Sequence, residues 1–187
     1  MTSRPGGRSQ VGATLVWPFP PAGLLVQGAY RELELVASLT SDQLQTLGDG
    51  AQLPRPWDPP SCTDDQLRGE LWDWLDDVVV WHNHEYVWDP RTAIPSCWPQ
   101  HPHLVHEIAV LADQRRRAGH ALSSDLLEDW HRYSLPAFAD RLQARLREHC
   151  LDSHGTWPAQ GRYTRHTSQE DRAFRRSNFG ADTRRRL

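Results

Sequence analysis

Residues 94–107, with the sequence IPSCWPQHPHLVHE, join two segments of helical pattern. They hold one thiol, one indole, three prolines and three imidazoles. Each proline fixes φ and biases the residue before it away from the helical region, so we expect a tight corner over residues 94–102. Pro102 suits the first position of a helix, because its missing amide proton would have no partner there. The corner is therefore predicted to be a wedge that joins two packed helices.

The clearest helix of the sequence precedes this corner. Thr63-Asp64-Asp65-Gln66 is a capping-box pattern, in which the Thr hydroxyl accepts from a backbone amide and the Gln side chain returns to the cap. We expect the helix to run from there to about His84. Residues at helical spacing form its apolar stripe: Leu67, Leu71, Trp74, Leu75, Val78 and His82.

A second stripe on the same helix is acidic and consists of Glu70, Asp73 and Asp77. Like charges at neighbouring helical positions cost roughly 0.2–0.5 kcal/mol per pair. We expect this face to be solvated and partly screened by the arginines at 115–117; a bound cation is the alternative.

Further helices are predicted after the corner. The first carries an apolar stripe, then cations that suit the helix dipole, and Gly119 as its end; the stripe is Leu104, Ile108, Leu111 and Ala112. Ser123 or Ser124 caps the next helix, which Pro136 breaks or kinks. Ser134 then caps a last helix through Phe138, Leu142 and Leu146 to about Cys150.

The two ends of the chain differ from this body. Residues 1–12 have the composition of a disordered start, and prolines give residues 17–21 an extended path. A helix is expected from Leu24 to Ala37, and a proline-rich linker around Trp57 lies either on the surface or against the core. Residues 152–187 read as a basic, mostly disordered tail with one marginal turn near residues 173–174. The predicted fold is a single-domain, all-α bundle of about four to five helices over residues 13–151.

Charge is distributed unevenly along the chain. All 21 basic residues are arginine, a bias that codon usage in a GC-rich genome produces. Residues 1–12 carry +2 and residues 152–187 carry +4, which leaves −9 for residues 13–151. The tail is a candidate nucleic-acid contact, with a solvated extension as the alternative; its candidate binding residues are Arg162, Arg165, Arg172, Arg175 and Arg176.

Cysteine usage and hydropathy bear on the compartment. Cys62, Cys97 and Cys150 are far apart and odd in number, so they do not form a disulfide framework. The apolar run from Ala13 to Ala29 is interrupted by prolines and is too short for a membrane span. We therefore expect a cytoplasmic protein with no membrane segment.

The imidazoles near the corner raise the question of a metal site. His82-x-His84 followed by Cys97-x-x-x-His101 has the overall spacing of a small zinc module, although imidazoles two apart on a helix point to nearly opposite sides. A second set joins imidazole and carboxylate groups in the first turns of the following helix. Together the candidate zinc ligands are Cys97, His101, His103, His106 and Glu107, in a metal-binding regulator or a metal-dependent hydrolase. The alternative is that the imidazoles cap the helix and that Cys97 is a small buried side chain.

No complete catalytic constellation can be assembled from the sequence. The serines lack a nucleophile elbow, and there is neither a phosphate-binding glycine loop nor a dinucleotide fingerprint. The pattern favours a non-enzymatic interaction protein that binds a protein partner through its helical body. The candidate binding residues of that body are Trp98, Arg115, Arg116 and Arg117.

Part of the chain resembles a group of actinobacterial proteins of unknown function that plasmids, integrative conjugative elements and phages encode. The residues that carry the resemblance are Pro95-Ser96-Cys97-Trp98, His101-Pro102-His103-Leu104-Val105-His106-Glu107, Leu111 and Trp130-His131. It covers about residues 65–150 and implies a helical, cytoplasmic accessory protein of a mobile element. It supplies no activity and no catalytic residue.

Overall fold

The computed structural model of the chain describes residues 15–40, 43, 53–146, 150 and 168–184. The chain divides into two compact units, Met1–Arg147 and Glu148–Leu187. Every regular element in the described ranges is helical, which confirms the all-α prediction. None of the helices in these ranges combines the length and the apolar content of a membrane span.

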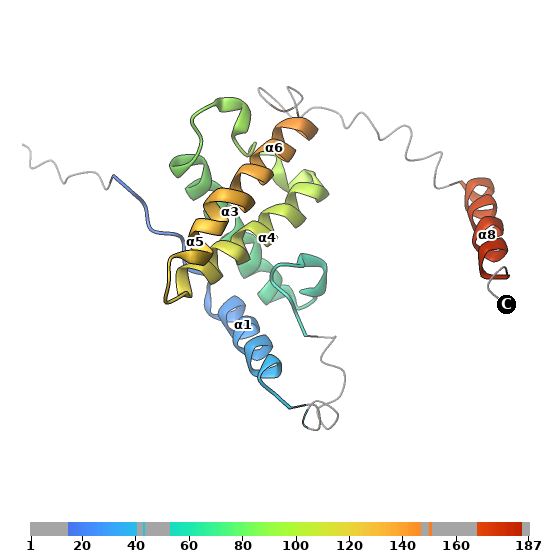
Figure 1. Cartoon of the computed structure of the whole chain (residues 1–187), viewed down its shortest axis with the longest axis horizontal. Coiled ribbons are helices and arrows are strands. Elements are labelled where there is room, and N and C mark those ends of the chain that lie inside the picture. Colours follow the sequence, from blue (N-terminus) through green and yellow to red (C-terminus); the bar gives the residue numbers. More distant parts are fainter. Residues whose placement is uncertain (1–14, 41–42, 44–52, 147–149, 151–167, 185–187) are drawn as a thin grey trace, which may run out of the picture. The chain divides into compact units, whose positions relative to one another are not determined.

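Four longer helices and several short turns form the first unit. Its α-helices are α1 (Leu24–Ala37), α3 (Asp65–Glu85), α4 (Pro102–His120), α5 (Asp125–Asp129) and α6 (Leu135–Leu146). The short 3-10 turns are η2 (Pro59–Ser61), η3 (Pro90–Thr92) and η4 (Trp98–Gln100), and a π-helical turn, η5 (Trp130–Ser134), joins α5 to α6. α4 contacts both α3 and α6, and α1 contacts α3 (Figure 1).

Helix α3 supplies much of the core. All six residues of its predicted apolar stripe are buried, so that prediction is confirmed. The cap differs by one residue, because the Asp64 side chain, not that of Thr63, accepts from the Leu67 backbone amide at 2.8 Å. Asp64 also places a carboxylate at the positive end of the helix dipole.

The corner of residues 94–102 forms as a tight turn ahead of α4. Pro102 is the first residue of α4, as predicted, and Leu104, Ile108, Leu111 and Ala112 are all buried. Trp98 in η4 is only 2 % exposed, and its indole Nε1 donates to Asp76 Oδ1 at 3.3 Å. Its indole therefore fixes the corner against α3, as expected of a wedge between packed helices.

Of the two outcomes predicted at Pro136, a break or a kink, the break does not occur. Residues 125–146 follow one helical path, in which the π-helical turn η5 lies directly before Pro136. Proline lacks an amide proton and its ring crowds the carbonyl four residues earlier, and the wider π turn relieves that crowding. Ser134 therefore lies inside the turn and starts no new helix.

Helix α1 depends on a carboxylate from α3. Gly23 precedes α1 and has no side chain to cap it, but Glu70 Oε1 accepts from the Val26 amide at 2.7 Å. The prediction that Glu70 lies on a solvated acidic face screened by arginine is therefore wrong. Within α1, Tyr30 is buried, whereas Leu24 is 77 % exposed.

We expect Gly23→Ala to destabilise the protein by about 1–2 kcal/mol, the usual cost of a lost helix cap. A Cβ at Gly23 would clash with Glu70 Cδ, so the carboxylate would have to leave the Val26 amide. Urea unfolding measures the effect. Gly28→Ala is the matched control, because its Cβ would meet nothing closer than 3.9 Å, and it should stabilise the helix by about 0.5–1 kcal/mol. Equal effects of the two substitutions would contradict the capping role of Glu70.

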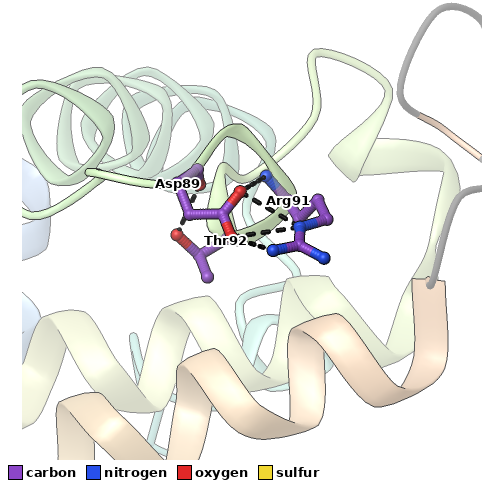
Figure 2. Close-up of polar contacts among 3 residues, drawn as sticks. All are labelled: Asp89, Arg91 and Thr92. Atoms are coloured by element: carbon purple, nitrogen blue, oxygen red, sulfur yellow. Dashed lines mark hydrogen bonds and ion pairs between the residues drawn. The ribbon is translucent and has the colours of Figure 1, made fainter.

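Two turns complete the first unit. Trp57 in the proline-rich linker stacks on Tyr30 with ring centroids 5.9 Å apart, so the linker lies against the core. Between α3 and the corner, the Asp89 carboxylate accepts from the backbone and side chain of Arg91, and Thr92 Oγ1 donates to the Asp89 carbonyl at 2.7 Å (Figure 2). These bonds close η3.

The second unit contains α8 (Gln169–Arg184), which is much longer than the single marginal turn predicted there. Ser168 Oγ accepts from the Asp171 amide at 3.1 Å, and Glu170 and Asp171 lie in the first turn, where the helix dipole favours acids. Residues 152–167 and 185–187 of the predicted tail lie outside the described residues.

Candidate anion-binding pocket

A cavity of about 690 Å³ opens between the N-terminal segment, α1 and the end of α4. Its volume falls in the range of small-ligand pockets, roughly 300–1,000 Å³. Three arginines and one glutamate contribute the charged groups of its wall: Arg31, Arg115, Arg116 and Glu34. Phe19, Pro20, Pro21 and Tyr30 supply apolar surface. The cavity is thus a cationic region in a part of the sequence whose net charge is −9.

The wall from the N-terminal segment is held by indoles of α3. Trp74 Nε1 donates to the Pro20 carbonyl and Trp81 Nε1 donates to the Trp17 carbonyl, each at 3.1 Å. The Trp17 ring also stacks on His84 with centroids 3.7 Å apart. Because buried indole N–H groups need an acceptor, these bonds both satisfy the tryptophans and fix the segment.

The Arg115 guanidinium lies among three aromatic rings from separate parts of the chain. Its Cζ is 5.3 Å from the Phe19 ring, 5.6 Å from the Trp81 ring and 5.9 Å from the Trp130 ring. Cation–π contacts of this kind contribute roughly 0.5–2 kcal/mol, more when water is excluded. The rings therefore hold the cation in place at the wall of the pocket.

Arg115 has no acidic partner in the described part of the chain, where no carboxylate lies within 4.0 Å of its guanidinium. Its Nε is buried and has no hydrogen-bond partner. A partly buried cation that lacks a counter-charge is costly, because aromatic faces compensate only part of the lost hydration. An anion in the pocket would supply that compensation.

Arg116 is different, because it is already paired. Its guanidinium contacts Asp113 Oδ1 at 3.4 Å and Glu34 Oε1 at 3.7 Å, and it lies 3.5 Å from the Tyr30 ring centroid. Burial, followed by the Asp113 charge, raises the pKa of Tyr30 far above its usual range. Tyr30 is therefore a neutral phenol next to the pair, and Arg115 carries the uncompensated charge.

Tyr86 contacts two of the three rings that surround Arg115. Its ring packs edge-on against Trp81 and Trp130 at 5.2 and 5.5 Å, and its hydroxyl is 3.2 Å from His131 Nε2. Burial raises the pKa of Tyr86, while the positive charge of Arg115 lowers it. The phenol stays neutral at physiological pH and leaves the charge of Arg115 unpaired.

The other predicted binding residues lie elsewhere. Arg117 is exposed and lines a separate cavity of about 520 Å³ with Trp57 and Leu33. Trp98 is in the core of the corner and is not available to a partner. In α8, Arg172 and Arg176 are exposed and Arg175 is half-buried, whereas Arg162 and Arg165 lie outside the described residues.

The predicted metal ligands separate into two groups. Cys97 Sγ and His101 Nε2 lie 3.4 Å apart, and the His103 ring centroid is 5.8 Å from that of His101. His101 is the N-cap residue of α4, but its ring makes no cap hydrogen bond, so the predicted capping role is wrong for it. Burial, then the charge of Arg145, lowers the pKa of His103.

Glu107 and His106 are engaged away from this corner. The Glu107 carboxylate binds Arg141, with Oε2 2.8 Å from Nε, and also binds Arg145. It thereby links α4 to α6. His106 is exposed and lines a cavity of about 420 Å³ with Tyr133 and Phe138.

The sequence predicts Arg115 and Arg116 as binding residues but does not indicate the pocket that they line. Phe19 falls in a segment that is predicted to be extended, and no sequence pattern connects Trp81 or Trp130 with the arginines. The three rings are brought to Arg115 by tertiary packing, which helical periodicity does not report. No protein-family model, curated protein or solved structure matches the chain.

Proposed function

We propose that the protein is a non-enzymatic accessory protein of an actinobacterial mobile genetic element that works in the cytoplasm and binds an acidic protein partner. One observation carries the partner assignment: Arg115 is held among aromatic rings at a pocket wall and has no carboxylate partner in the described residues. The place of the protein in a mobile element is supported only by the sequence resemblance of residues 65–150.

An acidic side chain suits the pocket for two reasons. A guanidinium binds a carboxylate through two parallel N–H···O bonds, which are among the strongest hydrogen bonds in proteins. The apolar wall of Phe19, Pro20 and Pro21 offers surface to the carbon chain that bears the carboxylate. A glutamate-rich segment of a partner meets both requirements.

Titration with a hexaglutamate peptide tests the proposal. The wild-type protein should bind it saturably and with an affinity that falls as salt is added. Arg115→Met should weaken binding about 10- to 100-fold, because a hydrogen bond to a charged group contributes about 1.5–3 kcal/mol. Calorimetry measures the affinity, and quenching of the indoles beside Arg115 provides a second readout.

Two controls make this titration specific. Arg117→Met removes an exposed arginine of the same helix that does not line the pocket, so its affinity should stay within about twofold of wild type. A hexaglutamine peptide should not bind. Equal affinities of Arg115→Met and wild type would rule out the pocket as the binding site.

Nucleic acid is a second candidate partner, through the second unit. The observation that favours it is the pair Arg172 and Arg176, which are exposed one helical turn apart on α8. Each arginine that contacts a phosphate contributes about one to the slope of log affinity against log salt. Duplex DNA binding by an Arg172→Gln, Arg176→Gln double variant should therefore show a slope smaller by about two; an unchanged slope counts against α8.

A further inference from the structure

We propose that the aromatic face of α3 is a recognition site for a proline-rich segment of a partner protein, and that residues 17–22 occupy this site in cis. These residues, here named the strap, have the sequence WPFPPA, and four of them also line the arginine pocket. The site is the surface of α3 that the strap covers. It needs no contact between Arg115 and an acidic peptide.

The strap has the composition of a polyproline-type ligand. Pro18-Phe19-Pro20-Pro21 is a Pro-x-x-Pro pattern, and its three prolines fix φ at the value of the polyproline II helix. That helix has no internal hydrogen bonds, so its carbonyls can accept from a binding surface. The strap lies outside the regular helices of the structure. Proteins that bind ligands of this kind do so through grooves lined by aromatic residues.

Two indoles of α3 bind the strap at a matching repeat. Trp74 Nε1 and Trp81 Nε1 donate to the carbonyls of Pro20 and Trp17, which are three residues apart. Three residues make one turn of a polyproline II helix, with a rise of about 9 Å. The two tryptophans are seven residues apart on α3, and seven helical residues rise about 10.5 Å. The strap therefore runs antiparallel to α3 and meets one indole at each end of a turn.

Aromatic side chains of the strap fill the groove between these hydrogen bonds. Phe19 packs edge-on against Trp81 and Trp74, with ring centroids 5.0 and 6.4 Å away. Trp17 stacks on His84 with centroids 3.7 Å apart. A matching ligand therefore has aromatic residues two positions apart, each followed by proline.

The strap is exchangeable, whereas the groove cannot stay empty. Trp17 is 41 % exposed, and Phe19 and Pro20 are half-buried, so the strap is bound at the surface. The indoles beneath it are buried, because Trp74 and Trp81 are only 2 % and 5 % exposed. Loss of the strap would leave both N–H groups without their acceptors, which is costly in an apolar environment. A ligand that displaces the strap must therefore supply carbonyls at the same spacing, and a proline-rich segment does so.

The connection of the strap to α1 favours a partner's segment over the strap of a second copy. Only Gly23 separates the strap from α1, and the Val26 amide of that helix is bound to Glu70 of α3. One residue spans at most about 3.6 Å, whereas the axes of packed helices lie about 8–10 Å apart. The strap therefore does not reach the groove of a second copy while α1 stays on its own α3.

Titration of the full-length protein with a labelled peptide of residues 15–22, LVWPFPPA, tests the proposal. Wild type should bind it weakly, because its own strap competes at a high effective concentration. A Trp17→Ala, Phe19→Ala double variant lacks the rings that hold the strap, so it should bind the peptide at least about tenfold more tightly. Fluorescence anisotropy measures the affinity, and circular dichroism establishes that the variant is folded. Trp17→Ala alone changes an exposed ring, so it should keep the fold and gain about 2- to 10-fold.

Two substitutions on α3, each made in the double variant, locate the bound peptide. Trp74→Phe removes an indole donor and should weaken binding about 2- to 10-fold. Trp72→Phe is the matched control, because that ring contacts Trp98 and Arg68 and not the strap; its affinity should stay within about twofold. A peptide with alanine in place of both aromatic residues should not bind.

Three results would overturn the proposal. Two of them are equal affinities of wild type and the double variant, and a folded double variant that does not bind the peptide. The third is a wild-type dimer that dissociates in the double variant, which would assign the groove to a second copy. Hexaglutamate binding by wild type, whose strap is intact, tests the arginine pocket separately.

Discussion

Trp130→Ala should destabilise the protein by about 3–5 kcal/mol, the range measured for removal of large buried aromatic side chains. Trp130 is 2 % exposed, and its ring lies close to those of Trp81 and Tyr86, with centroids 6.3 and 5.5 Å away. Its Nε1 donates to the Leu111 carbonyl at 3.2 Å, so the substitution also removes a side-chain hydrogen bond to a carbonyl in the interior of α4. The loss is a large share of the about 5–15 kcal/mol that stabilises a typical domain.

Denaturant unfolding with Trp130→Phe as the matched variant separates the two contributions. Phenylalanine keeps much of the buried apolar surface but lacks the indole N–H, so it should cost about 1–3 kcal/mol. Both substitutions alter one of the three rings around Arg115. Trp130→Ala removes that ring, so hexaglutamate binding should weaken even under conditions in which the variant is fully folded. A loss of stability below about 1 kcal/mol in Trp130→Ala would show that α5, η5 and α6 do not pack as described.

Stability should also fall by about 2–3 kcal/mol between pH 7 and pH 4.5 because of His82. This side chain is 3 % exposed, and burial alone lowers its pKa from 6.5 to about 4. Its ring faces Tyr86 and Phe138 at 6.0 and 5.7 Å, and its Nδ1 is buried without a hydrogen-bond partner. The folded state therefore holds a neutral imidazole.

The sign follows from proton uptake. Below pH 6.5 the unfolded chain binds a proton at His82 that the folded chain does not bind until about pH 4, so acid favours unfolding over that window. His103, whose pKa is also lowered by burial, adds a contribution in the same direction. The pKa values of Glu85 and Asp89 are lowered by hydrogen bonds, so their contributions are lost only at more acidic pH.

Unfolding free energies of His82→Leu at the two pH values check this prediction. The variant should lose most of the pH dependence, because leucine carries no titratable group and fits an apolar site. Val78→Ala, a buried substitution on the same helix, should lower stability by a similar amount at both pH values. A pH dependence in His82→Leu that equals that of wild type would assign the effect to other groups.

Periodicity predicted the parts of the fold in which one helix face is buried along its whole length. The stripes that contain Leu71 and Ile108 are buried as predicted, because a 3.6-residue repeat of apolar residues is typical of a helix with one face against a core. The position of Pro102 was also predicted, since its preference for the first turn of a helix is local. These are the features in which local and tertiary preferences agree.

Other features depend on contacts that no local pattern encodes. Glu70 reads as one of a row of acids, yet it caps α1, 44 residues earlier in the chain. In the sequence, the arginines at 115–117 have the pattern of cations that stabilise the end of a helix through its dipole. In the structure, the guanidinium of Arg115 lies among the rings of residues 19, 81 and 130. At Pro136, where a break or a kink was expected, a π turn leads directly into α6, and Trp130 and Phe138 on either side of the proline are buried. The types of residue in the candidate site could thus be predicted from the sequence, but their arrangement in space could not.

The most direct test of the arginine pocket is a crystal structure of the full-length protein with the hexaglutamate peptide. We expect a peptide carboxylate within about 3 Å of the Arg115 guanidinium nitrogens, with its carbon chain against Phe19 and the rings of Trp81 and Trp130 still around the cation. A peptide bound at another surface, with the Arg115 guanidinium facing only solvent, would contradict the account.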